Sequence, residues 1–373
     1  MENNIIVNRE LIIKPLQYVT NIISNKSLYP NLNNILIEVL DNGIVLFKST
    51  NLEIEITSFI KSKYLNKNYS VIIQGKKFYN ICRSLSKEDN IKIVFNINKM
   101  IISTKNCYFI ITTLPANNFP NINFLKHDIE FNLTNKILKK LIYATYFSIA
   151  NNDVRKYLNG LFLQIKNNIL NIISTDGHRL SFYQYILDKN LIDYSIIIPR
   201  KSIFELSKII NNTNDLINIK INNNYICFTF KNLKFISKLI VSNFPDYQQI
   251  IPKSFYQTIK INRILFKNVL NRISILVNEK TKGVNLLFSN KYLKIFTSNI
   301  NNEKAEEILE IEKFRNKQTH DIQISFNINY LIDVINILES NFIKLSFIDN
   351  TSSIKIEDNY DKNKIYLIMP MKI

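Results

Sequence analysis

The chain repeats itself three times along its length. Each copy contains a stretch of alternating apolar residues that ends in Thr or Ser followed by Asn or Asp. The three stretches are residues 45–51, 170–176 and 293–299. Their hydroxyl residues, Thr50, Thr175 and Ser298, are 125 and 123 residues apart. A period of this length predicts three tandem domains and excludes a solenoid, whose repeats span roughly 20–50 residues.

Two amphipathic segments recur in phase within each copy, with apolar residues at the i, i+3, i+4 spacing of a helix. The predicted helices are 9–23, 135–150 and 262–276 for the first segment, and 76–85, 200–210 and 327–338 for the second. Most of the remaining chain alternates with a period of two between Asn-rich breaks, which predicts antiparallel strands. The sequence therefore indicates an α+β fold in which each domain packs two helices on antiparallel sheet.

Phe-Pro pairs punctuate the two junctions between copies, at Phe119-Pro120 and Phe244-Pro245. Proline disfavours continuation of a helix, so these stretches are the predicted linkers. We expect an N-terminal domain at 1–126, a central domain at 127–250 and a C-terminal domain at 251–373.

The charge balance points to an anionic partner. The chain has 48 Lys and Arg against 30 Asp and Glu, a formal net charge of +18. Such a surface suits nucleic acid or an acidic membrane. The abundance of Asn, Ile and Lys is typical of an AT-rich genome, so part of the charge is background. Repeated positions of Lys and Arg therefore carry more weight than their number.

The sequence shows neither the pattern of a membrane span nor that of a signal peptide. No apolar run approaches the ~18 residues that a membrane span needs, and the acidic start, Glu2, precedes no apolar signal segment. We expect a cytoplasmic protein. Its three cysteines, Cys82, Cys107 and Cys227, are odd in number and far apart, which excludes a disulfide framework or a CxxC zinc pair.

The motif TDGHRL places Asp176, His178 and Arg179 together, a set that could serve acid–base chemistry. No GxSxG, HExxH or P-loop accompanies it, so we expect no catalytic site, metal or cofactor. The alternative is a basic nucleic-acid-modifying phosphodiester enzyme that uses Asp176 and His178. A sequence-specific DNA binder is a further alternative, although no zinc-finger spacing or basic region with heptads is present.

Nine motifs in order give the chain a resemblance to a known family. They are RELIIKPLQYV, GKKFYNICRSL, TTLPANNFPN, DVRKYLNG followed by TDGHRL, IPRKSIFEL, SKLIVSNFPDY, LVNEKTKGVNL, KAEEILE and MPMKI. Over essentially its full length the chain is similar to the bacterial sliding clamp, the beta subunit of DNA polymerase III.

The resemblance implies a DNA-clamp fold and a head-to-tail homodimeric ring of six similar domains, with helices around a central hole. Duplex DNA would pass through the hole without being read for sequence. The ring would act as a non-catalytic processivity factor in DNA replication. It would tether the DNA polymerase III alpha subunit and clamp-loader subunits, which bind through short linear peptides.

The resemblance also implies a pocket for these peptides between the second and third domains. Its residues would be Arg155, Tyr157, Leu158, Thr175, Gly177, His178, Arg179, Leu180, Pro245, Gln249, Ile250, Asn327, Tyr330, Thr351, Ser353, Leu367, Met369, Pro370 and Met371. Gln249 departs from the family, which commonly has Arg there. A charge-assisted contact to the peptide is then lost.

Two further sets follow from the resemblance. The DNA-binding positions would be Lys26, Lys76, Lys77, Arg83, Asn152, Lys156, Tyr157, Arg200, Lys201, Lys280 and Lys282. The dimer interface would pair Phe109 and Ile111 on an edge strand with Ile275 and Leu276 at the end of a helix. Two of the predicted second helices open with a basic pair, where the helix dipole also favours phosphate.

Overall fold

The computed structural model describes residues 3–23, 30–62, 68–124, 126–252, 254–299, 301–311, 313–315 and 321–372. The chain divides into two compact units. The first unit comprises Met1–Lys139 and Lys201–Leu239, and the second comprises Lys140–Arg200 and Ile240–Ile373.

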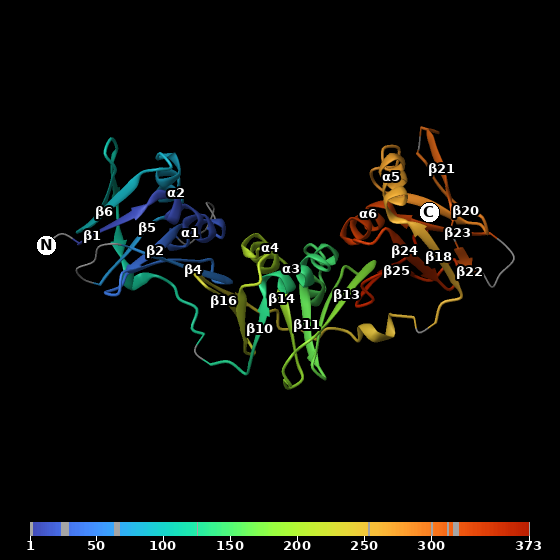
Figure 1. Cartoon of the computed structure of the whole chain (residues 1–373), viewed down its shortest axis with the longest axis horizontal. Coiled ribbons are helices and arrows are strands. Elements are labelled where there is room, and N and C mark those ends of the chain that lie inside the picture. The colour runs from blue at the N-terminus through green and yellow to red at the C-terminus, as the bar shows by residue number, and fades with distance from the viewer. Residues whose placement is uncertain are drawn as a thin grey trace. The chain divides into compact units, whose positions relative to one another are not determined.

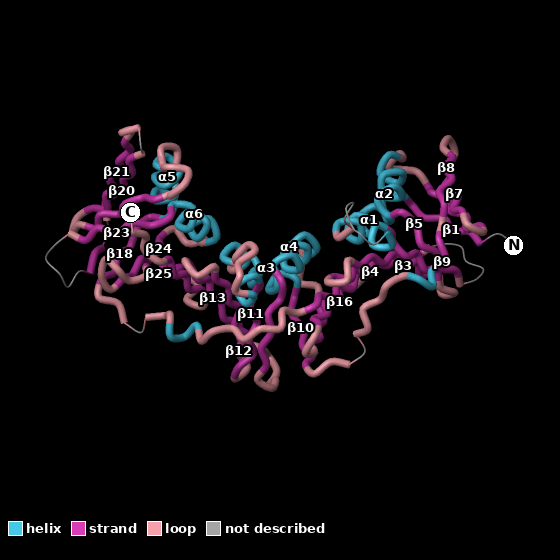
Figure 2. Tube along the Cα trace, turned by 180° about the vertical axis from the view of Figure 1, so that it is seen from behind, coloured by secondary structure: helices cyan, strands magenta, loops and turns pink. Residues whose placement is uncertain are grey.

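The first unit contains a four-stranded and a nine-stranded sheet (Figure 1). In spatial order, the strands of the small sheet are β1 (Asn3–Asn8), β6 (Asn90–Asn96), β7 (Lys99–Ser103) and β8 (Tyr108–Thr112). The strands of the large sheet are, in spatial order, β10 (Ile129–Thr134), β15 (Leu216–Ile221), β16 (Tyr225–Phe230), β17 (Leu233–Lys238), β4 (Ile54–Lys61), β3 (Ile44–Thr50), β2 (Asn34–Val39), β5 (Tyr69–Gln74) and β9 (Leu114–Pro115). Helices α1 (Arg9–Asn21) and α2 (Gly75–Ser84) pack side by side on these strands (Figure 2).

The second unit has the same plan. In spatial order, the strands of its nine-stranded sheet are β14 (Tyr194–Pro199), β11 (Gly160–Lys166), β12 (Ile169–Thr175), β13 (Arg179–Ile186), β26 (Lys364–Ile368), β25 (Ile354–Asp358), β24 (Phe342–Phe347), β18 (Gln257–Asn262) and β22 (Lys313–Arg315). The strands of its small sheet are β21 (Lys304–Glu310), β20 (Tyr292–Ser298), β19 (Gly283–Phe288) and β23 (Ile322–Asn327). Helices α5 (Arg263–Ile273) and α6 (Ile328–Ile337) pair within it. Helices α3 (Asn135–Tyr143) and α4 (Arg200–Ile209) cross the boundary between the units.

Each large sheet is made by joining two repeats edge to edge. Strand β4 pairs with β17 in the first unit, and β13 pairs with β26 in the second. All these ladders are antiparallel. The predicted α+β fold of three similar tandem domains is confirmed, with six helices near the predicted positions.

Side-chain caps explain where several helices begin. Asn8, Asn262 and Asn327 each accept a hydrogen bond from a backbone N–H two residues ahead, which satisfies a donor that the first helical turn leaves free. The helix predicted at 135–150 was too long, since α3 ends at Tyr143. The Thr145 hydroxyl donates to the Leu141 carbonyl, the Thr145 carbonyl accepts from Ser174, and a 3₁₀ turn follows.

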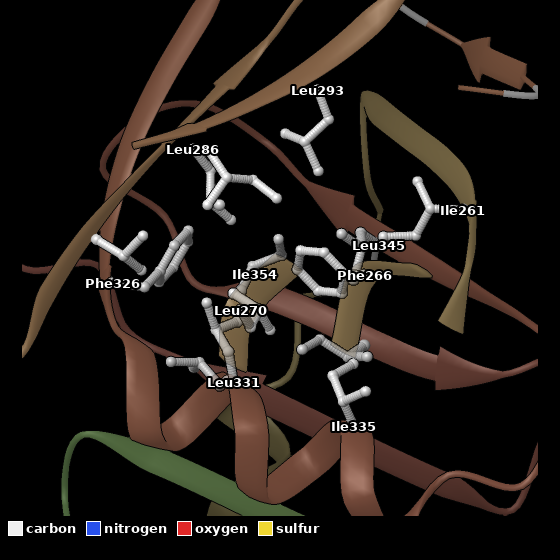
Figure 3. Close-up of a cluster of buried hydrophobic side chains, with 14 of the residues drawn as sticks. Ile261, Phe266, Leu270, Leu286, Leu293, Phe326, Leu331, Ile335, Leu345 and Ile354 are labelled. Carbon is white, nitrogen blue, oxygen red and sulfur yellow. The ribbon is translucent and has the colours of Figure 1, made fainter. Parts of the chain in front are cut away.

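The largest core of the second unit lies between α5, α6 and the strands (Figure 3). Phe266 and Leu270 lie one turn apart on α5, and Leu331 and Ile335 one turn apart on α6, all with no measurable exposure. This i, i+4 spacing puts each pair on one helix face, as the sequence pattern predicted.

Two of the three cysteines, Cys82 and Cys227, are buried, and all three are free thiols. Burial raises the pKa of Cys82 to about 12, so this thiol packs as a small apolar side chain. Within the described ranges, no helix has both the length and the apolar character of a membrane span.

Candidate functional site

A small apolar cluster separate from the main core lies in the second unit, where β13 pairs with β26. Leu180 lies opposite Leu367 across the two strands, and the two side chains are 3 % and 2 % exposed. The other members are Phe162, Ile173, Phe182, Ile197 and Tyr247, with Tyr157, Ile240, Phe244, Ile251 and Ile365 packed at the margin. The cluster therefore joins residues from β11, β12, β13 and β26 to the segment after β17.

Aromatic rings form one side of this cluster. Phe244 stacks on Phe162 with ring centroids 4.3 Å apart, and Tyr247 lies 5.6 Å from Phe182. Tyr157 meets Phe244 edge to face at 6.1 Å. Stacking of this kind stabilises a preformed apolar surface.

The TDGHRL motif is a tight turn at the rim of the cluster. The Thr175 hydroxyl donates to the Arg179 carbonyl at 2.6 Å and accepts from Gly177 N–H at 3.1 Å. Asp176 accepts from the backbone N–H groups of His178 and Arg179. Gly177 has φ of +90°, a conformation that favours glycine. The Asp176 carboxylate is thus committed to holding the turn.

Arg179 ties the turn to neighbouring elements. Its guanidinium donates to Asp176 Oδ2 at 3.0 Å, to Asp333 Oδ2 of α6 at 2.6 Å and to the Phe147 carbonyl at 2.6 Å. The same group lies 4.3 Å from the centroid of the Tyr330 ring. With a side chain only 10 % exposed, Arg179 positions the rim rather than presenting a free charge.

Arg155 forms a more exposed part of the rim. Its guanidinium donates to both Asp153 oxygens, at 3.0 Å each. These hydrogen bonds lower the pKa of Asp153 to about 2. A Cβ on Gly177 would lie 3.1 Å from Arg155 Nη2, so a side chain at position 177 would crowd the guanidinium.

The C-terminal Met369-Pro370-Met371 stretch continues past β26. Met369 N–H donates to the His178 carbonyl at 2.8 Å, and Met371 N–H donates to the Ser325 carbonyl at 2.8 Å. Met369 is 42 % exposed, beside the TDGHRL turn. A flexible thioether at this place can repack against different apolar groups.

The remaining predicted pocket residues lie in several settings. Leu158 and Ser353 are buried, Asn327 caps α6, and Thr351 donates twice to Asp349 in the turn before β25. Pro245, Gln249 and Ile250 are exposed in the segment after Phe244. Gln249 donates to Asp246 Oδ2 at 3.0 Å.

Sequence reasoning missed the aromatic side of the cluster and the supports of Arg179. The stretch that contains Phe244 and Tyr247 was predicted only as a linker, and no motif pointed to Phe162 or Phe182. The Phe-Pro-Asp-Tyr stretch could have predicted this aromatic packing, because aromatic residues in a linker need a surface on which to pack. Asp333 is distant in sequence, and no motif pointed to it.

The corresponding place in the first unit is polar. Strand register puts Glu55 at the position of Leu180 and Lys48 at that of Ile173. Glu55, 4 % exposed, accepts from Ile122 N–H at 2.9 Å and pairs with Lys48 at 3.7 Å. Phe119 packs on Leu36 and Ile72, which hold the register positions of Phe162 and Ile197. The two junctions therefore differ chiefly in the Glu55–Lys48 ion pair that replaces Leu180 and Ile173 in the first unit.

Basic residues gather at the starts of second helices. In α2, Lys76 and Lys77 line an open cleft of about 760 Å³, and Arg83 is exposed at the far end of the helix. Gln74 forms no side-chain cap, so backbone N–H groups remain available to an anion. Arg200 and Lys201 occupy the start of α4, where the Arg200 side chain also donates to the Ile149 carbonyl.

The third repeat has no basic pair at the start of its second helix, α6, but a lysine from a preceding loop lies next to that helix start. The Lys282 carbonyl accepts from Ile328 N–H, the first residue of α6, at 2.9 Å. Lys280 is exposed in the same loop, and Asn152 and Lys156 are exposed in the central repeat. Tyr157 packs in the apolar cluster. Lys26 lies outside the described residues.

The four predicted interface residues belong to different units, two to each. Phe109 is half-buried and Ile111 is 7 % exposed on β8, an edge strand of the first unit. Ile275 is 77 % exposed just after α5 in the second unit, with Leu276 half-buried beside it. Strand β21 is the free edge of that unit's small sheet.

Three repeats of the same two-helix, antiparallel unit, joined edge to edge, define the architecture of a DNA clamp. Models of the N-terminal, central and C-terminal domains of the DNA polymerase III beta subunit match residues 3–123, 132–246 and 248–372.

Curated relatives and solved structures agree. The chain is 34 % identical over 367 residues to the beta sliding clamp of Haemophilus influenzae, covering 98 % of this chain and 99 % of that protein. It is 33 % identical to that of Escherichia coli K12 with the same coverage. A DNA polymerase III beta subunit from Pseudomonas aeruginosa superposes with a TM-score of 0.94 at 29 % identity, over 99 % of this chain and 100 % of that one. Another Pseudomonas aeruginosa sliding clamp, solved bound to griselimycin, gives 0.95 at 29 % identity, with both chains fully covered.

The chain belongs to the DNA polymerase III beta subunit family, and its function is that of a DNA sliding clamp in DNA replication. The phosphodiester-enzyme alternative finds no support in these relatives. Its key carboxylate, Asp176, is instead engaged by the backbone of its own turn.

Proposed function

We propose that two copies of the chain close head to tail into a ring that encircles duplex DNA. The observation that carries this proposal is the identical register of the two internal junctions. Ile56 of β4 lies opposite Phe235 of β17, and Ser181 of β13 lies opposite Tyr366 of β26. The ladders within the repeats make Ile56 equivalent to Ser181, and Phe235 equivalent to Tyr366.

The third junction would use the two strands left at the free edges. By the same ladders, Ala305 of β21 corresponds to Ser181, and Phe109 of β8 corresponds to Tyr366. Strand β21 of one copy would then pair with β8 of the next, with Ala305 opposite Phe109. Two such contacts close a ring of two chains, because a heterologous interface closes when its rotation is right.

Side-chain packing supports the same assignment. Phe147 and Ile275 lie equally far from the starts of α3 and α5, and the Phe147 ring packs on Tyr366 at 6.0 Å. Ile275 of one copy would cover Phe109 of the next in this way. Tyr366, already covered, has no measurable exposure, whereas Ile275 is 77 % exposed. The apolar area available at Ile275 is what the interface would bury.

The DNA path follows from the basic helix starts. Lysine and arginine at equivalent places in successive repeats would contact phosphates, which position a protein on DNA without reading its sequence. We propose Lys76, Lys77, Arg200, Lys201 and Lys282 as the principal contacts. The remaining candidates are Lys26, Arg83, Asn152, Lys156 and Lys280.

The apolar cluster around Leu180 and Leu367 is proposed to bind short linear peptides of the DNA polymerase III alpha subunit and of clamp-loader subunits. Met369 and the Arg155 rim would border the bound peptide. Tethering through this pocket keeps the polymerase at high local concentration on DNA, so the clamp acts without catalysis. We place the protein in the cytoplasm, with domains at 1–126, 127–250 and 251–373.

Sedimentation equilibrium at nanomolar and micromolar concentrations tests the ring. We expect a mass about twice the chain mass of 43.9 kDa. Ile275→Asp should shift the protein towards monomer, because it places a charge in the apolar contact. The matched control Ile192→Asp, at another exposed isoleucine, should leave the mass unchanged. A wild-type monomer at every concentration would contradict the proposal.

A further inference from the structure

A cleft in the first unit indicates a second binding site. It is separate from the apolar cluster around Leu180 and Leu367, which we call the Leu180 pocket. The cleft has a volume of about 870 Å³ and lies between α1 and the joined strands β4 and β17. Its apolar lining includes Pro15, Phe59, Ile60, Phe230 and Leu233, and three lysines, Lys14, Lys61 and Lys231, border it. We call it the α1 cleft.

The second unit fills the equivalent place with its own side chains. The pair Ser58–Leu233 in the α1 cleft has the same register as the pair Tyr183–Lys364 between β13 and β26. Tyr183 is 5 % exposed and Ser58 is 2 % exposed, so the second unit has a buried ring where the first has only a small hydroxyl side chain, which lines the cleft.

A carboxylate completes the arrangement in the second unit. Asp361 Oδ2 accepts from the Tyr183 hydroxyl at 2.9 Å and pairs with Lys140 at 2.9 Å. Burial by itself would raise the pKa of Asp361, but the bonds from Lys140 and Tyr183 lower it below its ordinary value. Ring, carboxylate and lysine together form one closed cluster.

The α1 cleft has a lysine equivalent to Lys140, but it has no equivalent of the Tyr183 ring or of the Asp361 carboxylate. Lys14 and Lys140 are each the sixth residue of their helices. The turn from β16 to β17 has only Lys231 and Asn232, whereas the turn that carries Asp361 spans 359–363. The β16–β17 turn therefore carries no acid equivalent to Asp361. Within the described residues, Lys14 has no ion pair, and its ammonium lies 5.9 Å from the Tyr18 ring centroid.

The acids that also line the cleft are engaged elsewhere. Glu10 pairs with Arg9 at 2.6 Å, and Asp215 accepts from the Thr213 hydroxyl at 2.7 Å. The border facing the apolar lining is thus left with lysines that can accept an added negative charge.

We propose that the α1 cleft binds a peptide segment of a partner protein in which an aromatic residue adjoins an acidic one. The aromatic ring would take the place of Tyr183, on the lining that includes Leu233. The carboxylate would pair with Lys14 as Asp361 pairs with Lys140. This proposal is independent of ring closure and of the Leu180 pocket.

Fluorine NMR on the full-length protein tests the α1 cleft. The probe is acetyl-Tyr-Asp-amide carrying 3-fluorotyrosine, compared with the neutral acetyl-Tyr-Asn-amide. We expect saturable binding of the acidic probe and binding of the neutral one weaker by about tenfold or more, since a charged hydrogen-bond partner is lost.

Variants locate the bound probe. Ser58→Tyr copies the second unit and should abolish binding by filling the cleft, and Lys14→Ala should weaken it about tenfold. The matched controls Ser70→Tyr and Lys87→Ala change exposed residues outside the cleft and should bind like wild type. If Ser58→Tyr does not fold, the affinity of Lys14→Ala for the acidic probe still tests whether the probe binds in the α1 cleft.

Three results would overturn the proposal. The wild type could fail to bind the acidic probe at millimolar concentration, or the folded Ser58→Tyr and Lys14→Ala variants could bind it normally. Alternatively, Leu180→Ala could remove binding while the cleft variants do not, which would place the probe in the other pocket.

Discussion

Leu180 and Leu367 lie opposite each other across β13 and β26, and both belong to the small apolar cluster of the second unit. The same register in the first unit pairs Glu55 with Ile236. A buried carboxylate at one junction and a buried leucine at the other distinguish two otherwise similar sites, because an apolar anchor gains free energy only from apolar surroundings.

Met369→Ala should weaken peptide binding in the pocket while leaving the fold intact, because Met369 is 42 % exposed at its rim. We expect a loss of about 2 kcal/mol, roughly thirtyfold in affinity, if Met369 is an anchor contact. Fluorescence anisotropy with a labelled pentapeptide ending in Leu-Phe measures the change. Ile186→Ala, at an exposed position at the end of the neighbouring strand β13, serves as the control. Equal losses in both variants would argue against a specific pocket.

Glu55→Leu should destabilise the protein by about 1–3 kcal/mol, because it removes the acceptor of the Ile122 N–H and the carboxylate beside Lys48. Lys48 then keeps its hydrogen bond to Asn121 but has lost its ion pair. The double change Glu55→Leu with Lys48→Ile copies Leu180 and Ile173. It should cost less than the sum of the two single changes, since the unpaired lysine is removed as well. Urea unfolding of the four proteins gives the coupling free energy. Strict additivity would mean that Glu55 and Lys48 do not stabilise each other.

Tyr183 should titrate about two pH units above an ordinary tyrosine. Burial is the main cause that raises its pKa to about 12; the hydrogen bond with Lys140 opposes the shift, and the hydrogen bond to Asp361 supports it. Because the folded state holds the phenolic proton more tightly, the stabilisation is complete below pH ~10 and is lost as pH rises through 12. Ultraviolet difference titration of wild type against Tyr183→Phe isolates this group. A component near pH 10 would show that Tyr183 is not buried in solution.

The proposed ring register can be tested by cross-linking. If the third junction repeats the register of the internal ones, Glu306 of β21 would lie opposite Tyr108 of β8 in the next copy, and both side chains are exposed in the single chain. Tyr108→Cys with Glu306→Cys, in a Cys107→Ser background, should yield covalent dimers with a short bismaleimide. Moving the second cysteine to Lys313, on the other sheet of that unit, should abolish the product. Equal yields from both pairs would contradict the register.

The repeat architecture was predictable because each copy carries its own complete helix and strand periodicity. Helix starts were also accessible, since Asn8 and Asn262 are recognisable caps. The end of α3 was predicted too late, because the hydroxyls of Thr145 and Ser174 that end it belong to separate segments. Local patterns cannot show such a contact.

The pocket was only partly predictable. The TDGHRL turn and Met369 came from the family resemblance, which carries residues position by position. The support of Arg179 by Asp333 and the stacking of Phe244 on Phe162 depend on tertiary packing between distant segments. The polar counterpart at Glu55 became evident only when the strand registers of the two units were compared.

Retention on circular DNA tests most directly the claim that the protein is a topological clamp. The Tyr108→Cys, Glu306→Cys, Cys107→Ser protein is mixed with nicked circular DNA and cross-linked, and DNA-bound protein is then separated by gel filtration in 1 M salt. High salt removes phosphate contacts but not a closed ring. We expect cross-linked protein to stay with the circles and to be released once a restriction enzyme linearises them. Equal release from circular and linear DNA would show that the protein does not encircle DNA.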